Sequence, residues 1–423
     1  MSASNNFDAI IIGGGPAGAS SAAILAEKGH RVIVLEREKF PRYHVGESLL
    51  PFTFFPLQRL GLVEQMRKSQ FTKKYSVQFV SPSGKASQPF YFETRYEKNV
   101  AQTWQVLRSE FDELLLNNAR QKKAIVREEI AVKELLREGD RVVGVRARTK
   151  SGDVEEFFAP MTLDCTGKES FAAVRNGWRT PDPYLKKFAV WTYFKGAKRD
   201  DGVDEGATTV AFVPEKGWFW YIPQHNDMVS VGVVAEGKYL TRGGVKDLGR
   251  MFAREVEQNL WIKHYLSCGQ QTGPYFIANE FSFHSRHCAS EGLLLVGDAF
   301  SFLDPVFSSG VMLALKSGVM AGDVVSEAIA ANDFSPARFA EYGRYMREGI
   351  ENMRKLVYAF YEPNFSFRKL TDKHPELAGD VTDCLSGDVN KDFSKLWMAV
   401  REFCEVPEDL PYGQPLEKTD ALA

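Results

Sequence analysis

Two short apolar runs joined by small residues form the clearest pattern near the start of the chain. Residues 9–12 and 32–35 are continuously apolar, which is typical of strands buried on both faces of a parallel sheet. The alanines and serines between them favour a helix that packs closely on such a sheet. The pattern therefore predicts a β–α–β unit at the start of the fold.

Apolar and alternating patterns predict further elements downstream. Buried strands of the same sheet are expected at residues 162–167 and 293–298. Residues 132–136, 142–148 and 155–158 favour a short antiparallel meander. Further strands are expected at residues 75–80, 188–194, 208–213, 218–222 and 228–234. Helices are expected at residues 56–66, 110–122 and 311–329 and beyond about residue 335.

The order of these elements predicts an α/β protein whose chain visits one nucleotide-binding fold three times. A Rossmann-like domain of discontinuous segments carries an inserted, mostly antiparallel β-sheet domain for the substrate and a short helical C-terminal segment. The predicted segments of the first domain are 1–80, 105–180 and 286–345. Residues 81–104 and 181–285 are assigned to the substrate domain, and residues 346–423 to the helical segment.

The turn after the first strand has the spacing Gly13-x-Gly15-x-x-Gly18, and Glu36 ends the second strand. Gly13 permits a tight turn, Gly15 lets the backbone approach a pyrophosphate, and Gly18 allows close packing of helix on sheet. The helix N-terminus adds amide donors and a partial positive charge. Glu36 stands where a carboxylate would accept hydrogen bonds from an adenosine ribose. Together these residues predict a dinucleotide site.

Composition narrows the class of protein. The 423 residues include 53 lysines and arginines against 55 acidic residues, so neither nucleic acid nor an anionic membrane is expected as a partner. No apolar run is long enough to span a membrane, and we expect a soluble, cytoplasmic protein. The five cysteines are scattered, and neither they nor His284 and His287 have the spacing of metal ligands, so no metal is expected.

Aromatic residues are frequent, with 31 phenylalanines and 7 tryptophans. Their clusters at residues 91–96, 218–221 and 358–367 are consistent with a pocket for a flat or apolar substrate. Plain core packing explains the same clusters equally well. The sequence leaves both interpretations open.

Three separated motifs resemble the FAD-binding set of the glutathione-reductase-type flavoprotein monooxygenases. They are the glycine turn with Glu36, Asp164-x-x-Gly167, and Gly297-Asp298 within GDAFSFLDP. The resemblance implies that Asp298 bonds the ribityl hydroxyls of FAD and that the helix near Gly310 points its N-terminus at the flavin, where reduced flavin is negatively charged. The FAD-binding residues that it implies are Gly13, Gly15, Pro16, Ala17, Gly18, Glu36, Arg37, Arg42, Ser48, Arg108, Gly167, Gly297, Asp298, Pro305, Ser309, Gly310 and Val311.

Two further motifs are similar to those of flavin-dependent halogenases. They are the loop FPRYHVGESLLP at residues 40–51 and the box Trp218-x-Trp220-x-Ile222-Pro223. This resemblance implies that FADH2, O2 and chloride or bromide modify an aromatic or otherwise electron-rich small molecule, either free or tethered to a carrier protein. No nicotinamide site is evident, so the reduced flavin is expected from a separate flavin reductase.

In such enzymes hypohalous acid reaches a lysine beside the substrate, and the residue that matches here is Lys74. A lysine is ordinarily a solvated surface group, so Lys74 could instead be exposed. If it is buried, desolvation lowers its pKa and supplies a neutral amine for an electrophilic halogen. Trp218 and Trp220 are either a barrier between flavin and substrate or core aromatics.

Other roles stay open at this stage. Ser308, Ser309 and Gly310 offer amides to an anion or cap a helix. Asp304 with Pro305 either forms a turn that fixes this loop or contacts the flavin. Glu47 and Ser48 could order their loop over the flavin. The same scaffold also suits another monooxygenase or a geranylgeranyl-reductase-like enzyme. A non-catalytic flavin-binding protein is the alternative from another class.

Overall fold

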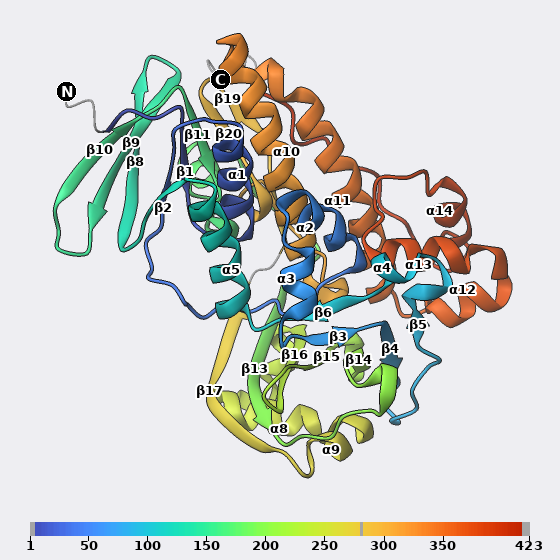
Figure 1. Cartoon of the computed structure of the whole chain (residues 1–423). Helices are drawn as coiled ribbons and strands as arrows, with labels where there is room; N and C mark the ends of the chain where they lie inside the picture. Colours follow the sequence, from blue (N-terminus) through green and yellow to red (C-terminus); the bar gives the residue numbers. More distant parts are fainter. Residues whose placement is uncertain (1–4, 280–281, 417–423) are drawn as a thin grey trace.

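A six-stranded sheet forms the upper part of the molecule in Figure 1, in the order β19-β20-β11-β1-β2-β7. The computed structural model describes residues 5–279 and 282–416. β1 pairs in parallel with β2 and β11, and β11 pairs in parallel with β20, which confirms the predicted β–α–β unit and its two distant strands. The strands are β1 (Ala9–Ile12), β2 (Val32–Leu35), β7 (Ile125–Arg127), β11 (Met161–Asp164), β19 (Ala289–Ser290) and β20 (Leu293–Leu295).

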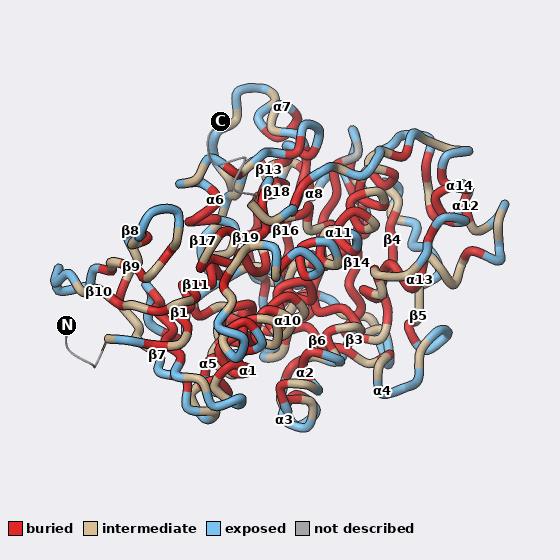
Figure 2. Tube along the Cα trace, turned by 90° about the horizontal axis from the view of Figure 1, so that it is seen from above, coloured by how far each residue is buried: buried red, intermediate tan, exposed pale blue. Residues whose placement is uncertain are grey.

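Helix α1 (Pro16–Glu27) packs tightly against α10 (Gly310–Ala331) because small residues line their contact. A Cβ atom on Gly318 would lie 2.5 Å from the carbonyl oxygen of Ala17, and one on Gly322 would lie 2.6 Å from the Cβ atom of Ile24. Both helices are mostly buried, as the red tubes of Figure 2 show. This close packing brings the N-terminus of α10 toward the turn that precedes α1.

A seven-stranded sheet forms the lower part of Figure 1, in the order β17-β13-β16-β15-β14-β4-β5. All of its pairs are antiparallel except β14 with β4. The sequence placed residues 76–80 in the first segment of the nucleotide-binding domain, whereas β4 belongs to this second sheet. We propose the same domain division with that one change. The strands are β4 (Ser76–Val80), β5 (Phe90–Tyr91), β13 (Lys187–Lys195), β14 (Thr208–Phe212), β15 (Trp218–Pro223), β16 (Met228–Glu236) and β17 (Gln270–Asn279).

The described residues also form three smaller sheets. The predicted meander is confirmed as β8 (Ile130–Glu138), β9 (Arg141–Thr149) and β10 (Val154–Phe158), all antiparallel. The single helix predicted over residues 56–66 is wrong, because Gly61 adopts φ of +78° and ends the first of two short helices. The other small strands are β3 (Thr72–Lys74), β6 (Thr103–Gln105), β12 (Arg179–Pro181), β18 (Phe283–Ser285) and β21 (Ser301–Phe302).

Helices cover both sheets and make up the C-terminal part, which lies on the right in Figure 1. The last four are α11 (Ala340–Tyr361), α12 (Phe367–Lys373), α13 (Ala378–Ser386) and α14 (Ser394–Val400). Phe360 of α11 stacks on Phe212 of β14 with ring centroids 5.1 Å apart, and Phe367 lies 5.1 Å from Phe79 of β4. An aromatic layer therefore joins the C-terminal helices to the second sheet.

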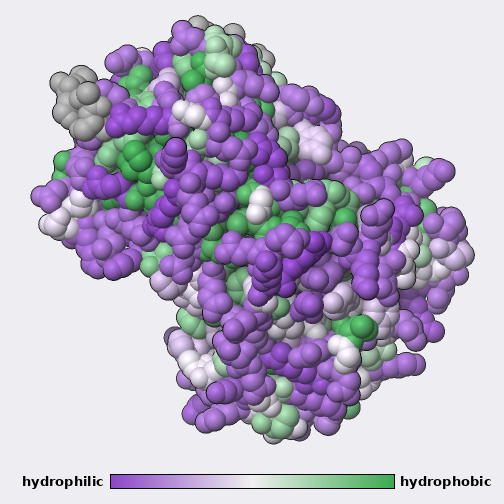
Figure 3. Space-filling model, in the orientation of Figure 1, coloured by the Kyte–Doolittle hydropathy of each residue, from purple (hydrophilic) through white to green (hydrophobic). Residues whose placement is uncertain are grey.

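Apart from α5, each of the remaining helices has at most nine residues. They are α2 (Phe54–Leu60), α3 (Val63–Lys68), α4 (Lys98–Ala101), α5 (Arg108–Gln121), α6 (Phe171–Arg175), α7 (Gly237–Leu240), α8 (Leu248–Val256) and α9 (Leu260–Leu266). Within the described ranges, none of the helices combines the length and the apolar character needed to cross a bilayer. The face seen in Figure 3 is mostly hydrophilic, with hydrophobic patches at the upper left and near the middle of the view.

Candidate functional site

A sharp turn at residues 13–18 carries the chain from β1 into α1. Gly13 has φ of +100°, and a Cβ atom there would lie 2.6 Å from the carbonyl oxygen of Cys165. A Cβ atom on Gly18 would lie 1.9 Å from the carbonyl oxygen of Gly13. At Gly15 the nearest atom to such a Cβ is Nη2 of Arg42, at 3.4 Å. A side chain therefore has no room at Gly13 or Gly18, whereas Gly15 faces open space beside the cation of Arg42. A phosphate-binding turn requires this arrangement.

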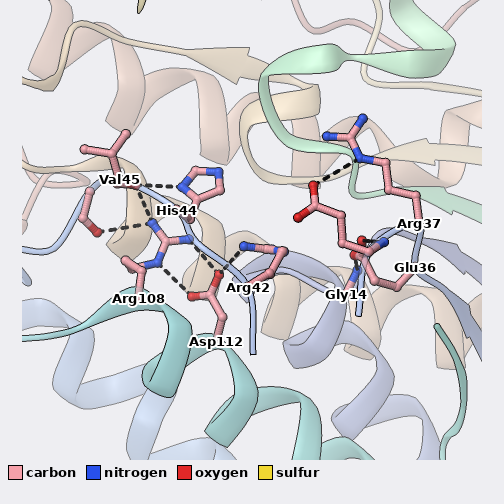
Figure 4. A network of polar contacts seen from close by, with 10 residues as sticks. Gly14, Glu36, Arg37, Arg42, His44, Val45, Arg108 and Asp112 are labelled. Atoms are coloured by element: carbon pink, nitrogen blue, oxygen red, sulfur yellow. Dashed lines mark hydrogen bonds and ion pairs between the residues drawn. The ribbon is translucent and has the colours of Figure 1, made fainter. Parts of the chain in front are cut away.

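Glu36 supports this turn from the end of β2. Its carboxylate accepts hydrogen bonds from the backbone N–H of Gly14 at 2.7 Å and from that of Glu38 at 2.8 Å. The side chain of Arg37 extends away from Gly14, as Figure 4 shows. It forms an ion pair with Glu169. Glu36 therefore fixes the turn, and binding of a ribose by its remaining acceptor capacity stays a prediction.

The loop at residues 40–51 is clamped to α5 by a buried ion-pair network, which Figure 4 shows. Arg108 donates from Nε and Nη2 to both oxygens of Asp112, at 2.7 and 2.9 Å. It also donates from Nη1 to the carbonyl oxygens of Val45 and Gly46. Arg42 reaches the same Asp112 at 3.1 Å. Burial acts to raise the pKa of Asp112, but the two guanidinium groups outweigh it and lower that pKa.

Between these elements lies a cavity of about 530 Å³. Its wall combines residues from the glycine turn, the 40–51 loop, α5, the end of β11, the second sheet and the start of α10. The predicted FAD-binding residues on this wall are Gly13, Gly15, Pro16, Ala17, Glu36, Arg37, Arg42, Ser48, Arg108, Gly167, Asp298, Pro305, Gly310 and Val311. The fold therefore brings together residues that are up to about three hundred positions apart in the chain.

Three predicted residues lie behind the wall. Gly18 packs against Gly13, and a Cβ atom on Gly297 would lie 3.0 Å from the Cβ atom of Ala17. Ser309 is 2% exposed, and its carbonyl oxygen accepts the N–H of Leu313 as α10 begins. These residues shape the cavity through packing, because none of them is among its lining residues.

Asp298 presents a carboxylate to the cavity. Within the described part of the chain it has no hydrogen-bond partner, although Arg108 and Lys168 are near enough to act on it electrostatically. Burial raises the pKa of Asp298 to about 7 against the opposing effect of these cations. A half-buried acceptor without a protein partner is suited to the hydroxyl groups of a ligand.

Asp304 behaves differently, because its oxygens are already used. It accepts hydrogen bonds from the N–H of Val306 at 3.1 Å and from the hydroxyl of Tyr361 at 2.9 Å. Burial raises the pKa of Asp304 to about 6. These contacts support the interpretation of residues 304–305 as a turn that fixes the loop before α10.

Lys74 is buried, with 1% exposure, so it is not the solvated surface lysine that the sequence allowed. The loop residue Ser48 pairs with Gln105 of β6, and Lys74 of β3 pairs with Thr103 of the same strand. Nζ of Lys74 consequently donates to Oγ of Ser48 at 3.0 Å and to the carbonyl oxygen of Leu49 at 3.1 Å. Ser48 lines the cavity and Lys74 does not, so the hydroxyl group of Ser48 lies between Nζ of Lys74 and the cavity.

The environment of Lys74 favours its neutral form. No carboxylate is paired with it in the described part of the chain, and burial alone lowers its pKa to about 7. The ring of Phe92 lies 5.4 Å from Nζ. The neighbouring Lys73 is exposed, so the two adjacent lysines differ sharply in environment.

Trp218 and Trp220 both line the cavity and are also buried, so they are wall residues and core aromatics at once. Nε1 of Trp218 donates to the hydroxyl of Tyr361 at 2.8 Å, and Nε1 of Trp220 donates to Oγ of Ser230 at 3.1 Å. Each indole is therefore fixed by a hydrogen bond as well as by packing. Tyr361 belongs to the aromatic cluster at residues 358–367, but the sequence predicted no individual role for it.

Sequence reasoning missed Asp112, Trp191 and Thr208. The spacing of Asp112 from Arg108, four residues along one helix, was a usable signal for their ion pair. Trp191 and Thr208 lie on the cavity wall, and nothing in their local sequence distinguishes them from other residues of buried strands. Their role comes from the pairing of the second sheet.

The residues present fit FAD. The open face of Gly15 beside Arg42 suits a pyrophosphate, and the unpartnered carboxylate of Asp298 suits ribityl hydroxyls. The start of α10, at Gly310 and Val311, lies on the same wall, where its amide groups would favour negative charge on a reduced flavin.

Comparison with known proteins agrees with this fit. The family model described as tryptophan halogenase matches residues 8–93 and 81–369. A chlorinase of 1H-pyrrole-2-carbonyl on a peptidyl-carrier protein, from Pseudomonas fluorescens, is 31% identical over 91% of this chain and 90% of its own length. A brominase named for the same carrier-bound group, from Pseudoalteromonas luteoviolacea, is 28% identical over 92% of this chain and 93% of its own length.

Solved structures give the same result. The flavin-dependent brominase Bmp2 superposes with a TM-score of 0.84 at 27% identity, covering 94% of this chain and 97% of its own. The myxobacterial chondrochloren halogenase CndH superposes with a TM-score of 0.78 at 31% identity, covering 90% and 91%.

Proposed function

Since this chain belongs to the tryptophan halogenase family and is an FAD-dependent enzyme of the halogenase type, we propose that it halogenates an electron-rich aromatic acyl group held on a carrier protein. The observation that carries the proposal is the buried Lys74, joined through Ser48 to the cavity wall. The reductase and hydroxylase alternatives have no comparable support, because they give no role to a buried neutral amine.

FAD in its reduced form, when bound, supplies the reaction with O2 that oxidises chloride or bromide. Arg42 and the glycine turn would hold its pyrophosphate, and Asp298 would hold its ribityl chain. The clamp of Arg108 on Asp112 keeps the 40–51 loop over this part of the cavity. The protein contributes position and electrostatics to this step.

Lys74 would handle the oxidised halogen. Its pKa of about 7 leaves a large share of free amine near neutral pH. The amine can take up the halogen from hypohalous acid with loss of water, or the ammonium form can orient the acid by hydrogen bonding. The ring then gains the halogen and loses a proton, so that atoms and charge balance in either route.

Trp218 and Trp220 would separate the flavin from the aromatic substrate. Both are large, buried and hydrogen-bonded in place, so they reduce the space available to water and to the substrate. Exclusion of water protects a reactive halogen species from side reactions. A separate flavin reductase would provide FADH2.

The carrier-bound substrate is proposed from two relatives. The chlorinase and the brominase named for carrier-bound pyrrole-2-carbonyl each align over at least nine-tenths of both chains. A pyrrole ring is electron-rich and therefore reacts readily with an electrophilic halogen.

The test uses the holoenzyme with chemically reduced FAD, O2 and bromide. Pyrrole-2-carbonyl is offered both on a carrier protein and as a small thioester, and products are identified by mass spectrometry. The expected result is a brominated acyl group on the carrier substrate. Lys74→Ala should lose on the order of 10²- to 10⁴-fold in product formation, the usual contribution of a positioned catalytic group.

Lys73→Ala is the matched control, because it removes the adjacent exposed lysine and should retain the activity of the unmodified protein. Hydroxylated product, or equal activity in Lys74→Ala and Lys73→Ala, would overturn the proposed reaction. Bromination of the free thioester alone would overturn the carrier substrate and leave the reaction standing.

A further inference from the structure

Glu47 is the buried carboxylate of the 40–51 loop, and it is connected to the protein surface by two tyrosines. We propose that Glu47, Tyr193 and Tyr43 form a proton path between the solvent and the cavity. Glu47 is 1% exposed and lines the cavity, whereas Tyr43 is 46% exposed. The hydroxyl of Tyr193 donates to Oε1 of Glu47 at 2.7 Å and lies 3.0 Å from the hydroxyl of Tyr43.

Glu47 and Trp191 together set the direction of this chain of hydroxyl groups. The single hydrogen of Tyr193 is used on Glu47, so in the proposed path the hydroxyl of Tyr43 donates across its contact with Tyr193. Nε1 of Trp191 donates to the hydroxyl oxygen of Tyr43 at 2.7 Å. The tyrosine oxygen therefore has one acceptor position filled, and its own hydrogen is available to point at Tyr193. The ring of Tyr43 is held by stacking on Phe276, with centroids 4.6 Å apart. Two separate contacts thus fix Tyr43 between solvent and Tyr193.

The family reaction needs a proton from outside the site. One FADH2, one O2, one halide ion, one proton and one aromatic C–H give FAD, the halogenated product and two waters, with atoms and charge balanced. Each turnover therefore takes up at least one proton, and a second when the reduced flavin is anionic, although the site must restrict bulk water. A path of hydrogen-bonded side chains satisfies both requirements.

The path moves a proton without leaving a charge on either tyrosine. A proton from solvent binds the oxygen of Tyr43 as the hydrogen of Tyr43 passes to Tyr193 and that of Tyr193 passes to Glu47. Both phenols are neutral before and after, and Glu47 becomes protonated at the cavity wall. Burial raises the pKa of Tyr193 well above its usual value, which disfavours a stepwise route through a phenolate.

The surroundings of Glu47 suit a group that gains and loses a proton. Burial raises its pKa, while hydrogen bonds from Tyr193 and Ser230 and the charge of Arg108 oppose that effect. Ser230 of β16 donates to Oε2 at 3.1 Å. Gln224 also lowers the pKa, and Arg108 keeps most of its donors on Asp112 and the loop carbonyls. Among the residues that the structure describes, no cation forms an ion pair with Glu47 that would hold it permanently ionised.

The first measurement needs no turnover. Infrared spectra of the oxidised holoprotein, recorded from about pH 5 to about pH 9, should contain a protonated-carboxyl band that titrates and that is missing in Glu47→Gln. Tyr193→Phe should shift its midpoint upward by about one pH unit, because it removes a hydrogen bond to the ionised form. Absence of a titrating band from Glu47 would overturn the proposal even if the halogenation reaction holds.

The second measurement follows proton uptake during reaction. Reduced holoenzyme is mixed rapidly with O2 and bromide in weak buffer containing a pH-indicator dye. Tyr193→Phe and Tyr43→Phe should each slow proton uptake on the order of tenfold, with FAD affinity unchanged. Imidazole should restore the rate of Tyr43→Phe, because the neighbouring Tyr193 remains.

Tyr221→Phe is the matched control, because Tyr221 is a buried tyrosine of the same sheet whose hydroxyl donates to the carbonyl oxygen of Lys198. It should take up protons at the rate of the unmodified enzyme. Uptake by Tyr193→Phe at the rate of Tyr221→Phe would overturn the path. Two results together would also overturn the path: proton uptake by Tyr43→Phe stays slow when imidazole is added, and FAD binding is weaker. They would identify Glu47 as a support for the loop.

Discussion

The buried Lys74 should make the protein less stable at neutral and acidic pH than at alkaline pH. Its pKa falls from 10.5 to about 7 on folding because burial disfavours the ammonium form. At pH values below the folded pKa of about 7, burial of the ammonium group lowers the free energy of unfolding by its full amount. This loss of stability disappears as the pH rises to the unfolded pKa of 10.5. Stability therefore increases with pH between about 7 and 10.5.

The magnitude follows from the two pKa values. A shift of about 3.5 pH units, from 10.5 to about 7, at about 1.4 kcal/mol per unit, sets an upper limit of about 5 kcal/mol at low pH. At pH 9 about 2 kcal/mol remains, so Lys74 contributes roughly 2–3 kcal/mol to the difference in stability between pH 6 and pH 9. Lys74→Met keeps the length of the side chain and removes the charge, and it leaves Ser48 and Leu49 without a donor at a cost of about 1–3 kcal/mol.

Urea denaturation of the holoproteins at about pH 6 and about pH 9 measures this effect. Relative to the unmodified protein, Lys74→Met should be more stable at the lower pH, and its advantage should shrink by roughly 2–3 kcal/mol at the higher pH. Lys73→Met, at the exposed neighbour, should follow the unmodified protein at both. A difference between Lys74→Met and the unmodified protein that does not change with pH would refute the reasoning.

Three further predictions concern the cofactor site and the packing beneath it. Asp112→Asn leaves the buried guanidinium of Arg108 and the half-buried one of Arg42 without their carboxylate. It should lower the free energy of unfolding by about 3–5 kcal/mol in urea titrations, with Glu113→Gln as a more exposed control. Asp298→Ala should weaken FAD binding by about 10- to 100-fold in fluorescence titrations, and unchanged affinity would remove Asp298 from the site. Gly318→Ala should lower the melting temperature, because its methyl group would lie 2.5 Å from the carbonyl oxygen of Ala17 and force α1 from α10. An unchanged melting temperature would contradict that packing.

Much of the first sheet could be predicted because its signals are local. The apolar run at residues 9–12, the glycine spacing and Glu36 each require a particular backbone geometry, and the structure contains β1, the turn and β2 accordingly. The start of β4 was predicted to within one residue. Its residues were assigned to the nucleotide-binding domain, whereas β4 pairs with β14 in the second sheet. Strand pairing depends on contacts between distant segments, which a local pattern does not encode.

The sequence alone determined the type of turn at Gly13, the strands β13 to β16 and the candidacy of Lys74, because these depend on residue type and spacing. Only the tertiary structure decided that Lys74 is buried behind Ser48, that Asp112 holds two arginines, and that Glu47 meets Tyr193 and Tyr43. The reason is desolvation: the protonation and partners of these groups depend on which strands and loops exclude water from them, and those elements come from separate parts of the chain.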